Sequence, residues 1–250
     1  MSTYVYGITA RSHPALPEGL GGVGDPPRPV RALTEGDLTA VVSDAPEGLR
    51  PKRRDLLAHQ SVLGETGAAG CVLPMRFGSV APDDSTVVEV LAERADHFAE
   101  RLDALDGRTE INVKATHVED AVLHRVLADS PELRALAEAG RQHGGGSQEQ
   151  RLQLGEMIAT AIRAQEAQDQ AVLLETLAPR AAATSSGPAS TGWLANLSFL
   201  VDRDTTADFL TAVDELRQAA PHLELSVNGP LPPYSFVEPG PAGPAPGADT

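Results

Sequence analysis

The 250-residue chain has a globular balance of 41% hydrophobic and 22% charged residues, enough for one large core or two of ordinary size. Its net charge of −15 argues against a nucleic-acid-binding protein, which gains affinity from Lys and Arg. The same repulsion disfavours an anionic membrane surface, and no segment approaches the roughly 20 apolar residues that cross a bilayer. Residues 1–108 carry 11 basic and 16 acidic side chains, so the second half is the more acidic one.

The cysteine count and the amino terminus indicate the compartment. Cys71 is the single cysteine, so it cannot form an internal disulfide, which fits a reducing environment. The amino terminus has no basic start followed by an apolar run, as a secretion signal would. We therefore expect a cytoplasmic protein.

The first half of the chain alternates strands with helices. We predict strands over Thr3–Thr9 and Leu38–Ser43 and helices over Lys52–Gly64 and Thr86–Leu105. An extended segment, Cys71–Val80, lies between the two helices. The first helix is expected to bury a face made of Leu56, Leu57, His59 and Leu63. The second helix starts with a capping-box pattern at Thr86 and Glu89.

The second half repeats this alternation. A half-buried strand is predicted over Ile111–Val118, followed by two helices that meet at Ser130-Pro131. We then predict a long alanine-rich helix over Gln148–Leu177 and a loop over Arg180–Gly192. Strands are predicted over Trp193–Val201 and Leu223–Val227, with an amphipathic helix over Thr205–Ala219 between them. We expect an α+β fold with two domains, 1–108 and 109–238, and a disordered tail over 239–250.

One segment matches a nucleotide-binding motif by letter only. Gly19–Gly24 (GLGGVG) has the spacing of a dinucleotide fingerprint, which needs a helix directly after it to face the pyrophosphate. Here Asp25 and three prolines follow within five residues and cannot open such a helix. We therefore predict a turn and no bound cofactor.

The remaining reactive residue types also lack a recognisable pattern. The seven histidines form no H-x-x-x-H pair, although His117 and His124 lie on different predicted elements and could meet in space. We expect exposed or hydrogen-bonded histidines and no metal site, with His59 on a helix face as the first to examine. Cys71 beside Val72 and Leu73 has no neighbouring base, which indicates a buried residue and not a nucleophile. Thus no catalytic residue is predicted.

The stretch Arg50–Arg54 (RPKRR) is the only basic cluster. One interpretation is a solvated loop that enters a helix; the other is a docking surface for an acidic partner. Positive charges at a helix start oppose the macrodipole by a few tenths of a kcal/mol each, which slightly favours the docking interpretation. Candidate partner-binding residues are Arg50, Lys52, Arg53, Arg54 and Arg76.

Two further segments have unusual backbone chemistry. They are Val72–Val80 (VLPMRFGSV) and Asn228–Phe236 (NGPLPPYSF). Because prolines lack amide donors, the second segment is expected to be rigid and extended, with Tyr234 and Phe236 on one face, clamped onto the second domain. Residues with a structural role in these segments are predicted to be Pro74, Arg76, Phe77, Gly78, Gly229, Pro230, Pro232, Pro233, Tyr234 and Phe236.

These segments occur in order with Tyr4–Gly7 at the start and a strand around Glu110 and Lys114. The ordered set resembles the gas vesicle protein F/L family (GvpL/GvpF) over nearly the whole chain. One difference is Leu231, where that family usually has tryptophan.

The resemblance implies an accessory protein of gas vesicles, the gas-filled protein shells that give cells buoyancy. It implies contact with the small hydrophobic shell subunit or with other accessory proteins, as adaptor, chaperone or minor shell component. It also implies a second domain that is a variant of the ferredoxin-like fold, and it supplies no catalytic residues. The competing hypothesis is a cytoplasmic enzyme with a dispersed active site around Arg76, His59 or His117.

Overall fold

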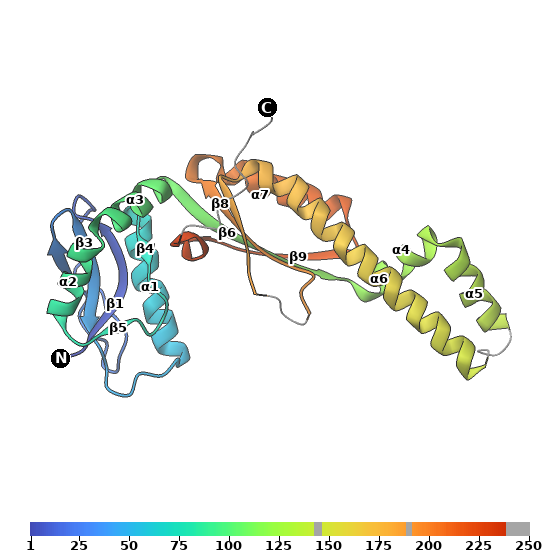
Figure 1. Cartoon of the computed structure of the whole chain (residues 1–250), viewed down its shortest axis with the longest axis horizontal. Helices are drawn as coiled ribbons and strands as arrows, with labels where there is room; N and C mark the ends of the chain where they lie inside the picture. The colour runs from blue at the N-terminus through green and yellow to red at the C-terminus, as the bar shows by residue number, and fades with distance from the viewer. Residues whose placement is uncertain (143–146, 189–191, 239–250) are drawn as a thin grey trace, which may run out of the picture. The chain divides into compact units, whose positions relative to one another are not determined.

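The computed structural model describes residues 1–142, 147–188 and 192–238. Contacts divide it into two units, one of Met1–Ile111 with the chain from Gly229 on, and one of Asn112–Asn228. Each unit holds a sheet with helices packed on it, so the predicted α+β class is confirmed (Figure 1). The predicted tail lies outside the described residues, and the ferredoxin-like character of the second domain stays a prediction.

The first unit is built on an antiparallel sheet. Its elements are β1 (Thr3–Ala10), β2 (Arg31–Glu35), β3 (Leu38–Asp44), α1 (Arg53–Ala69), β4 (Leu73–Pro74), β5 (Val80–Ala81), α2 (Asp84–Glu93) and α3 (Ala95–Leu105). The strand order is β2-β3-β1-β4, and β5 also pairs with β1. Both strands of the extended segment therefore lie beside β1, antiparallel to it. β2 was missed in the sequence because its charged and alternating residues form an edge strand.

Helices cover both faces of this sheet. Successive strand residues point to opposite faces, and Tyr4 contacts His59 of α1 while Thr3 donates to Asp84 of α2. Figure 1 shows α1 on one side of the strands and α2 and α3 on the other. The predicted shared face is confirmed for Tyr4 and Tyr6, which belong to one buried cluster, but not for Ile8. The pairing of β1 with β3 shifts register between Val5 and Gly7, so Gly7, and not Ile8, faces Leu63 of α1 together with the tyrosines.

Helix α1 turns a different face inward than the sequence suggested. Its buried residues are Asp55, His59, Val62, Leu63, Thr66 and Gly67. Leu56 and Leu57 are instead 37% and 53% exposed, so the predicted apolar face was half wrong. The reason is that the sheet places Tyr4 and Tyr6 against this helix, where His59 bonds to the Tyr4 hydroxyl and stacks on the Tyr6 ring.

The predicted helix Thr86–Leu105 is two helices. Asp83, not Thr86, is the N-cap, because its carboxylate accepts hydrogen bonds from the Thr86 amide at 2.8 Å and hydroxyl at 2.9 Å. The break falls at Arg94, whose ψ of 22° leaves the helical region. Two short helices can then each place an apolar face on the sheet.

The second unit contains a four-stranded sheet in the order β7-β8-β6-β9. Its elements are β6 (Arg108–His117), α4 (Glu119–Asp129), α5 (Pro131–Gln142), α6 (Gln148–Leu177), β7 (Ala183–Ser186), β8 (Ala195–Asp202), α7 (Thr206–Ala219) and β9 (Leu223–Leu231). The bounds predicted for α6 are confirmed. β7 was predicted to be loop, because this short edge strand consists of Ala, Thr and Ser.

The core of the second unit lies between the sheet and two helices. Phe209 of α7 packs against Phe199 of β8, with ring centroids 5.2 Å apart. Leu173 and Leu177 at the end of α6 are fully buried, whereas α4 and α5 pack along α6. The sheet thus meets α6 only in its later turns, where Asp169 is also buried.

The closing segment does not follow its prediction. β9 ends at Leu231, and a 3₁₀ turn forms at Tyr234–Phe236, so the segment is not extended throughout. Tyr234 packs against the first unit's core, which includes Tyr4, Tyr6 and Val72. The predicted clamp on the second domain is therefore wrong, and residues 229–238 group with the first unit, unlike in the predicted 109–238 domain.

Candidate functional site

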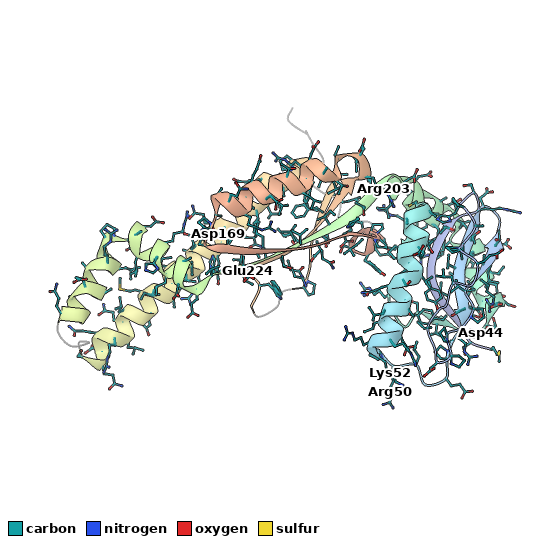
Figure 2. All side chains as sticks on the ribbon, turned by 180° about the vertical axis from the view of Figure 1, so that it is seen from behind. Asp44, Arg50, Lys52, Asp169, Arg203 and Glu224 are labelled. Atoms are coloured by element: carbon teal, nitrogen blue, oxygen red, sulfur yellow. The ribbon has the colours of Figure 1, made fainter. Side chains whose placement is uncertain are left out.

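The predicted basic cluster gathers at the start of α1. Arg50, Lys52, Arg53 and Arg54 are all exposed there, and the exposed Leu56 and Leu57 follow within one turn. Figure 2 shows Arg50 and Lys52 extending from this end of the helix. We call these six residues the α1 surface. It combines positive charge with apolar side chains that the first unit leaves uncovered.

Most charges of the α1 surface have no counterion in the part of the chain that the structure describes. Arg54 forms ion pairs with Asp25 at 2.5 Å and with Asp55 at 3.4 Å. Among the described residues, Arg50, Lys52 and Arg53 form no ion pair, although the chain carries 35 acidic side chains. These cations also lie at the positive end of a helix dipole, which disfavours them by a few tenths of a kcal/mol each. An anionic group from outside would relieve both effects.

Arg76 lies elsewhere in the first unit, in the turn between β4 and β5, and its side chain is exposed. Its carbonyl oxygen accepts hydrogen bonds from the Ser79 amide and hydroxyl. His59 of α1 donates to the neighbouring Met75 carbonyl at 3.1 Å and so ties this turn to the helix. No described contact joins the Arg76 side chain to the α1 surface.

The sequence motifs of the first unit meet around Tyr4. Its hydroxyl lies 2.9 Å from His59 Nδ1 and accepts from the Gly78 amide at 3.1 Å. The Phe77 ring packs edge-on to both, with centroids 6.0 Å from Tyr4 and 5.8 Å from His59. Tyr234 packs on the same cluster. Three motifs far apart in sequence thus build one core.

The remaining motif residues shape the backbone around this core. Pro74 is buried beside Gly7 of β1, and Gly78 turns the chain with a φ of 90°. Gly229 has a φ of 148° and lies so close to Ile111 that a Cβ would be 2.8 Å from its Cδ1. The carbonyl of Leu231 accepts a hydrogen bond from Thr109 at 3.0 Å, so its structural role needs no indole ring.

Burial fixes the protonation of the core. It raises the pKa of Tyr4 and of Tyr6, and it lowers the pKa of His59 despite the hydrogen bond to Met75. A neutral His59 with its proton on Nε2 fits the contacts, because Nδ1 can then accept from Tyr4. Burial together with Glu110 raises the pKa of Tyr234 to about 12. His59 is thereby a structural residue with both ring nitrogens in use.

The glycine-rich segment is a loop, as predicted. Its Gly21 bridges to Pro29, and its amides bond inside the protein: Gly22 to the Arg28 carbonyl, Val23 to the Tyr6 hydroxyl and Gly24 to Asp55. A bound phosphate would need backbone amides of this loop as hydrogen-bond donors, but these three amides already donate to groups of the protein. Cys71 is half-buried and donates to the Leu102 carbonyl at 3.5 Å.

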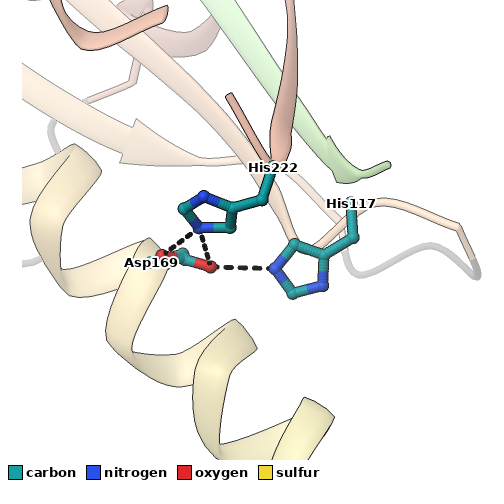
Figure 3. A group of neighbouring side chains, drawn as sticks. All are labelled: His117, Asp169 and His222. Carbon is teal, nitrogen blue, oxygen red and sulfur yellow. Dashed lines mark hydrogen bonds and ion pairs between the residues drawn. The ribbon is translucent and has the colours of Figure 1, made fainter. Parts of the chain in front are cut away.

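The second unit contains a polar cluster that the sequence did not reveal. His117 Nε2 lies 2.8 Å from Asp169 Oδ2, and His222 Nε2 lies 3.0 and 3.1 Å from its two oxygens (Figure 3). Gln165 also donates to Oδ1 of Asp169, at 2.9 Å. Burial raises the pKa of Asp169, but these hydrogen bonds outweigh it and hold the pKa below its usual value. His124, the partner considered for His117, is exposed on α4.

A pocket of about 390 Å³ opens next to this cluster. His117 forms part of its wall, together with Arg163 and Glu166 of α6 and with Trp193. Lys114 lies 5.0 Å from the centroid of the Trp193 ring. The pocket therefore combines an imidazole, a guanidinium, a carboxylate and an indole. In the described residues, no helix has both the length and the apolar character to span a membrane.

These features define a two-unit α+β protein, and comparison with known proteins identifies its class. The model of the family "Gas vesicle synthesis protein GvpL/GvpF" matches residues 2–238, so the chain belongs to this family. It is 62% identical to gas vesicle protein F of Streptomyces sp. (strain CB03234), over 95% of this chain and all of that protein. It is 31% identical to gas vesicle protein L of the same strain, over 94% of this chain and 92% of that one.

The fold also matches a solved structure. The crystal structure of the gas vesicle protein GvpF from Anabaena sp. PCC7120 superimposes with a TM-score of 0.75, over 97% of this chain and 98% of that one, at 24% identity. This likeness confirms the fold. The family membership and the relatives establish a gas vesicle protein of the F/L type.

Proposed function

We propose that this chain is a non-enzymatic accessory protein of gas vesicle assembly, which acts in the cytoplasm and at the gas vesicle. It binds the small hydrophobic shell subunit or other accessory proteins through the α1 surface. The observation that carries the proposal is the group of unpaired cations, Arg50, Lys52 and Arg53, beside the exposed Leu56 and Leu57. Family membership over residues 2–238 supports the gas vesicle role.

The chemistry of the α1 surface specifies the partner segment. Unpaired cations favour a segment with carboxylates, and they speed encounter by electrostatic attraction. The two leucines add apolar area that a hydrophobic partner can bury, at about 25 cal/mol per Å² removed from water. An amphipathic acidic segment satisfies both requirements, and its binding should weaken as salt increases.

Co-expression with the shell subunit and accessory proteins, followed by pull-down, tests this proposal. The triple variant Arg50→Glu, Lys52→Glu and Arg53→Glu should lose most of the captured partner without a fall in melting temperature, since carboxylates at a helix start are favoured by its dipole. Arg54 is kept because it pairs with Asp25. A charge-preserving control, Arg50→Lys, Lys52→Arg and Arg53→Lys, should bind as the natural protein does. Equal capture by the charge-reversed variant would place the binding surface elsewhere.

The proposed function has two forms, which differ in whether the protein stays in the finished gas vesicle. A transient adaptor or chaperone leaves once the shell is built, whereas a minor shell component stays. Gas vesicles purified by flotation and washed in high salt, then probed for this chain, distinguish the two. Because the α1 surface relies on charge, we expect the salt wash to release the protein, as for an adaptor.

One observation favours the enzyme alternative, namely the pocket that gathers His117, Arg163 and Glu166. An enzyme with its site there would lose its effect on vesicle formation in an Arg163→Ala, Glu166→Ala variant that still folds and binds partners. Under the accessory function that we propose, this variant forms vesicles normally. In the first unit, catalysis by His59 is not favoured, because its two ring nitrogens are engaged by Tyr4 and by the Met75 carbonyl.

A further inference from the structure

We propose that His117, Asp169 and His222 form a binding site for a single divalent transition-metal ion, with Zn²⁺ as the ion that these ligands fit best. The inference lies wholly within the second unit and does not depend on the gas vesicle role. It follows from where the fold brings the three residues, from their donor atoms and from their burial.

Three elements meet at this point. His117 is the last residue of β6, Asp169 lies in the later part of α6, and His222 directly precedes β9. Asp169 is 52 and 53 positions away in sequence from the two histidines. Figure 3 shows both imidazoles directed at the same carboxylate. The amide of Val118 donates to the His222 carbonyl, so the strands hold the two histidines side by side.

The donor atoms suit a metal ion. One atom from each residue, two imidazole nitrogens and a carboxylate oxygen, lie within 4.8 Å of one another. Two histidines and one carboxylate are the protein ligands of a common class of zinc site. Ligands of a tetrahedral Zn²⁺ lie roughly 3.3–3.4 Å apart at its usual bond lengths. The contacts of 2.8–3.1 Å with Asp169 would therefore lengthen by a few tenths of an ångström, and the two imidazole nitrogens, which lie within 4.8 Å of each other, would adjust to the same spacing.

The negative charge of Asp169 is buried and therefore favours a positive partner. Asp169 and His222 are each 4% exposed. Within the described residues, the two histidines and Gln165 form hydrogen bonds with the Asp169 carboxylate, and no Lys or Arg pairs with it. A buried carboxylate is costly without a positive partner. A divalent cation would supply this charge, and the imidazoles would then bind it through the Nε2 atoms that now face the carboxylate.

The surroundings complete the site. The Gln165 amide holds one carboxylate oxygen, which orients Asp169 as outer partners of metal ligands do. His117 also lines the pocket of about 390 Å³, so water can reach the cluster from that side and fill a fourth position. An ion there would tie α6 to β6 and to the start of β9.

Metal binding to the untagged full-length chain tests the inference. After dialysis against a chelator, titration with ZnCl₂ in a calorimeter should give one ion per chain, with a Kd in the micromolar range or tighter and a higher melting temperature. Co²⁺ in place of Zn²⁺ should give the visible absorption of a four-coordinate ion. Absence of saturable binding, with no thermal shift, would overturn the proposal.

Variants locate the ion. His117→Gln and Asp169→Asn should each weaken Zn²⁺ binding by about 100-fold or more, and Gln165→Ala by roughly 10- to 100-fold. The matched control is His124→Gln, an exposed histidine on α4 that should bind as the natural protein does. Equal loss of binding in this control, or undiminished binding in both ligand variants, would refute the site. Circular dichroism of each chelator-treated variant shows that it has folded.

Discussion

Ser235 and Glu110 are joined by two hydrogen bonds, from the Ser235 amide to Oε2 at 2.8 Å and from its hydroxyl to Oε1 at 2.7 Å. Glu110 is 4% exposed, so its carboxylate is buried against the turn that carries Tyr234 and Phe236. The turn Tyr234–Phe236 is thereby fastened to the first unit. The Arg101 side chain adds a hydrogen bond to the Phe236 carbonyl at 3.1 Å.

Replacement of Glu110 should loosen this turn. We expect Glu110→Gln to lower the free energy of unfolding by about 1–2 kcal/mol, and Glu110→Ala by about 2–3 kcal/mol, because charge-assisted hydrogen bonds are lost. Urea denaturation at neutral pH measures both. Glu224→Ala, at an exposed position of β9 (Figure 2), is the control and should stay within about 0.5 kcal/mol of the natural protein. Equal stability of the Glu110 and Glu224 variants would contradict the role of the pair.

Truncation of Tyr234 should destabilise the first unit. Tyr234→Ala removes a ring that packs on Tyr4 and Tyr6, and we expect a loss of about 2–4 kcal/mol. Tyr234→Phe keeps the ring and should lose less than about 1 kcal/mol.

The aromatic residues provide a separate signal for each unit. All 3 tyrosines lie in the first unit and the single tryptophan, Trp193, in the second. For Tyr234→Ala, the unfolding transition in the tyrosine near-ultraviolet signal should shift at least as far as that in Trp193 fluorescence. A shift in the Trp193 transition alone would restore the original prediction of a clamp on the second domain.

Gly229 should not tolerate a side chain. Its φ of 148° is strained for other residues, and a Cβ would lie 2.8 Å from Ile111 Cδ1 and 2.9 Å from the Glu110 carbonyl oxygen. Gly229→Ala should therefore cost about 1–3 kcal/mol. The control is Gly64→Ala in α1, where nothing lies within 4 Å of the added methyl. It should stabilise the helix by about 0.5–1 kcal/mol, and thermal denaturation compares the two. We expect Gly229→Ala to lower the melting temperature and Gly64→Ala to raise it.

Acid should weaken the first unit through His59. The pKa of His59 is lower in the folded protein than in the unfolded chain. Below about pH 6.5 the unfolded chain therefore binds more protons than the folded protein, and the free energy of unfolding decreases as the pH decreases. Protonated His59 would also turn Nδ1 into a donor and break its bond from Tyr4. His59→Gln cannot titrate. The stability of the natural protein relative to this variant should decrease between about pH 7.5 and pH 5, as measured by denaturation across that range.

The control for this pH effect is His124→Gln, because His124 is exposed. Its stability difference from the natural protein should stay constant over the same range. If the His59→Gln difference is equally constant, His59 does not account for the acid sensitivity.

Local patterns were sufficient for much of the fold. Capping at Ser147 and a long run rich in Ala, Gln, Glu and Leu gave α6 its predicted bounds. Alternation correctly placed Tyr4 and Tyr6 on one buried face, whereas a register shift in β1 turns Ile8 to the other face. The ordered motifs indicated the family, which the match over residues 2–238 confirms. These features depend on neighbours a few positions apart, so the sequence contains them directly.

Long-range packing decided the rest. Leu56 and Leu57 are exposed because the face of α1 that carries His59 meets the tyrosines. Tyr234 packs in the first unit because β9 leads the chain back there. Asp169 reaches His117 and His222 because a helix turn and two strands, some 52 positions apart in sequence, converge on one point. Patterns over a few neighbouring residues cannot predict contacts between residues so far apart in sequence. The sequence by itself therefore determined the family and most of the elements, while the tertiary structure determined which side chains meet.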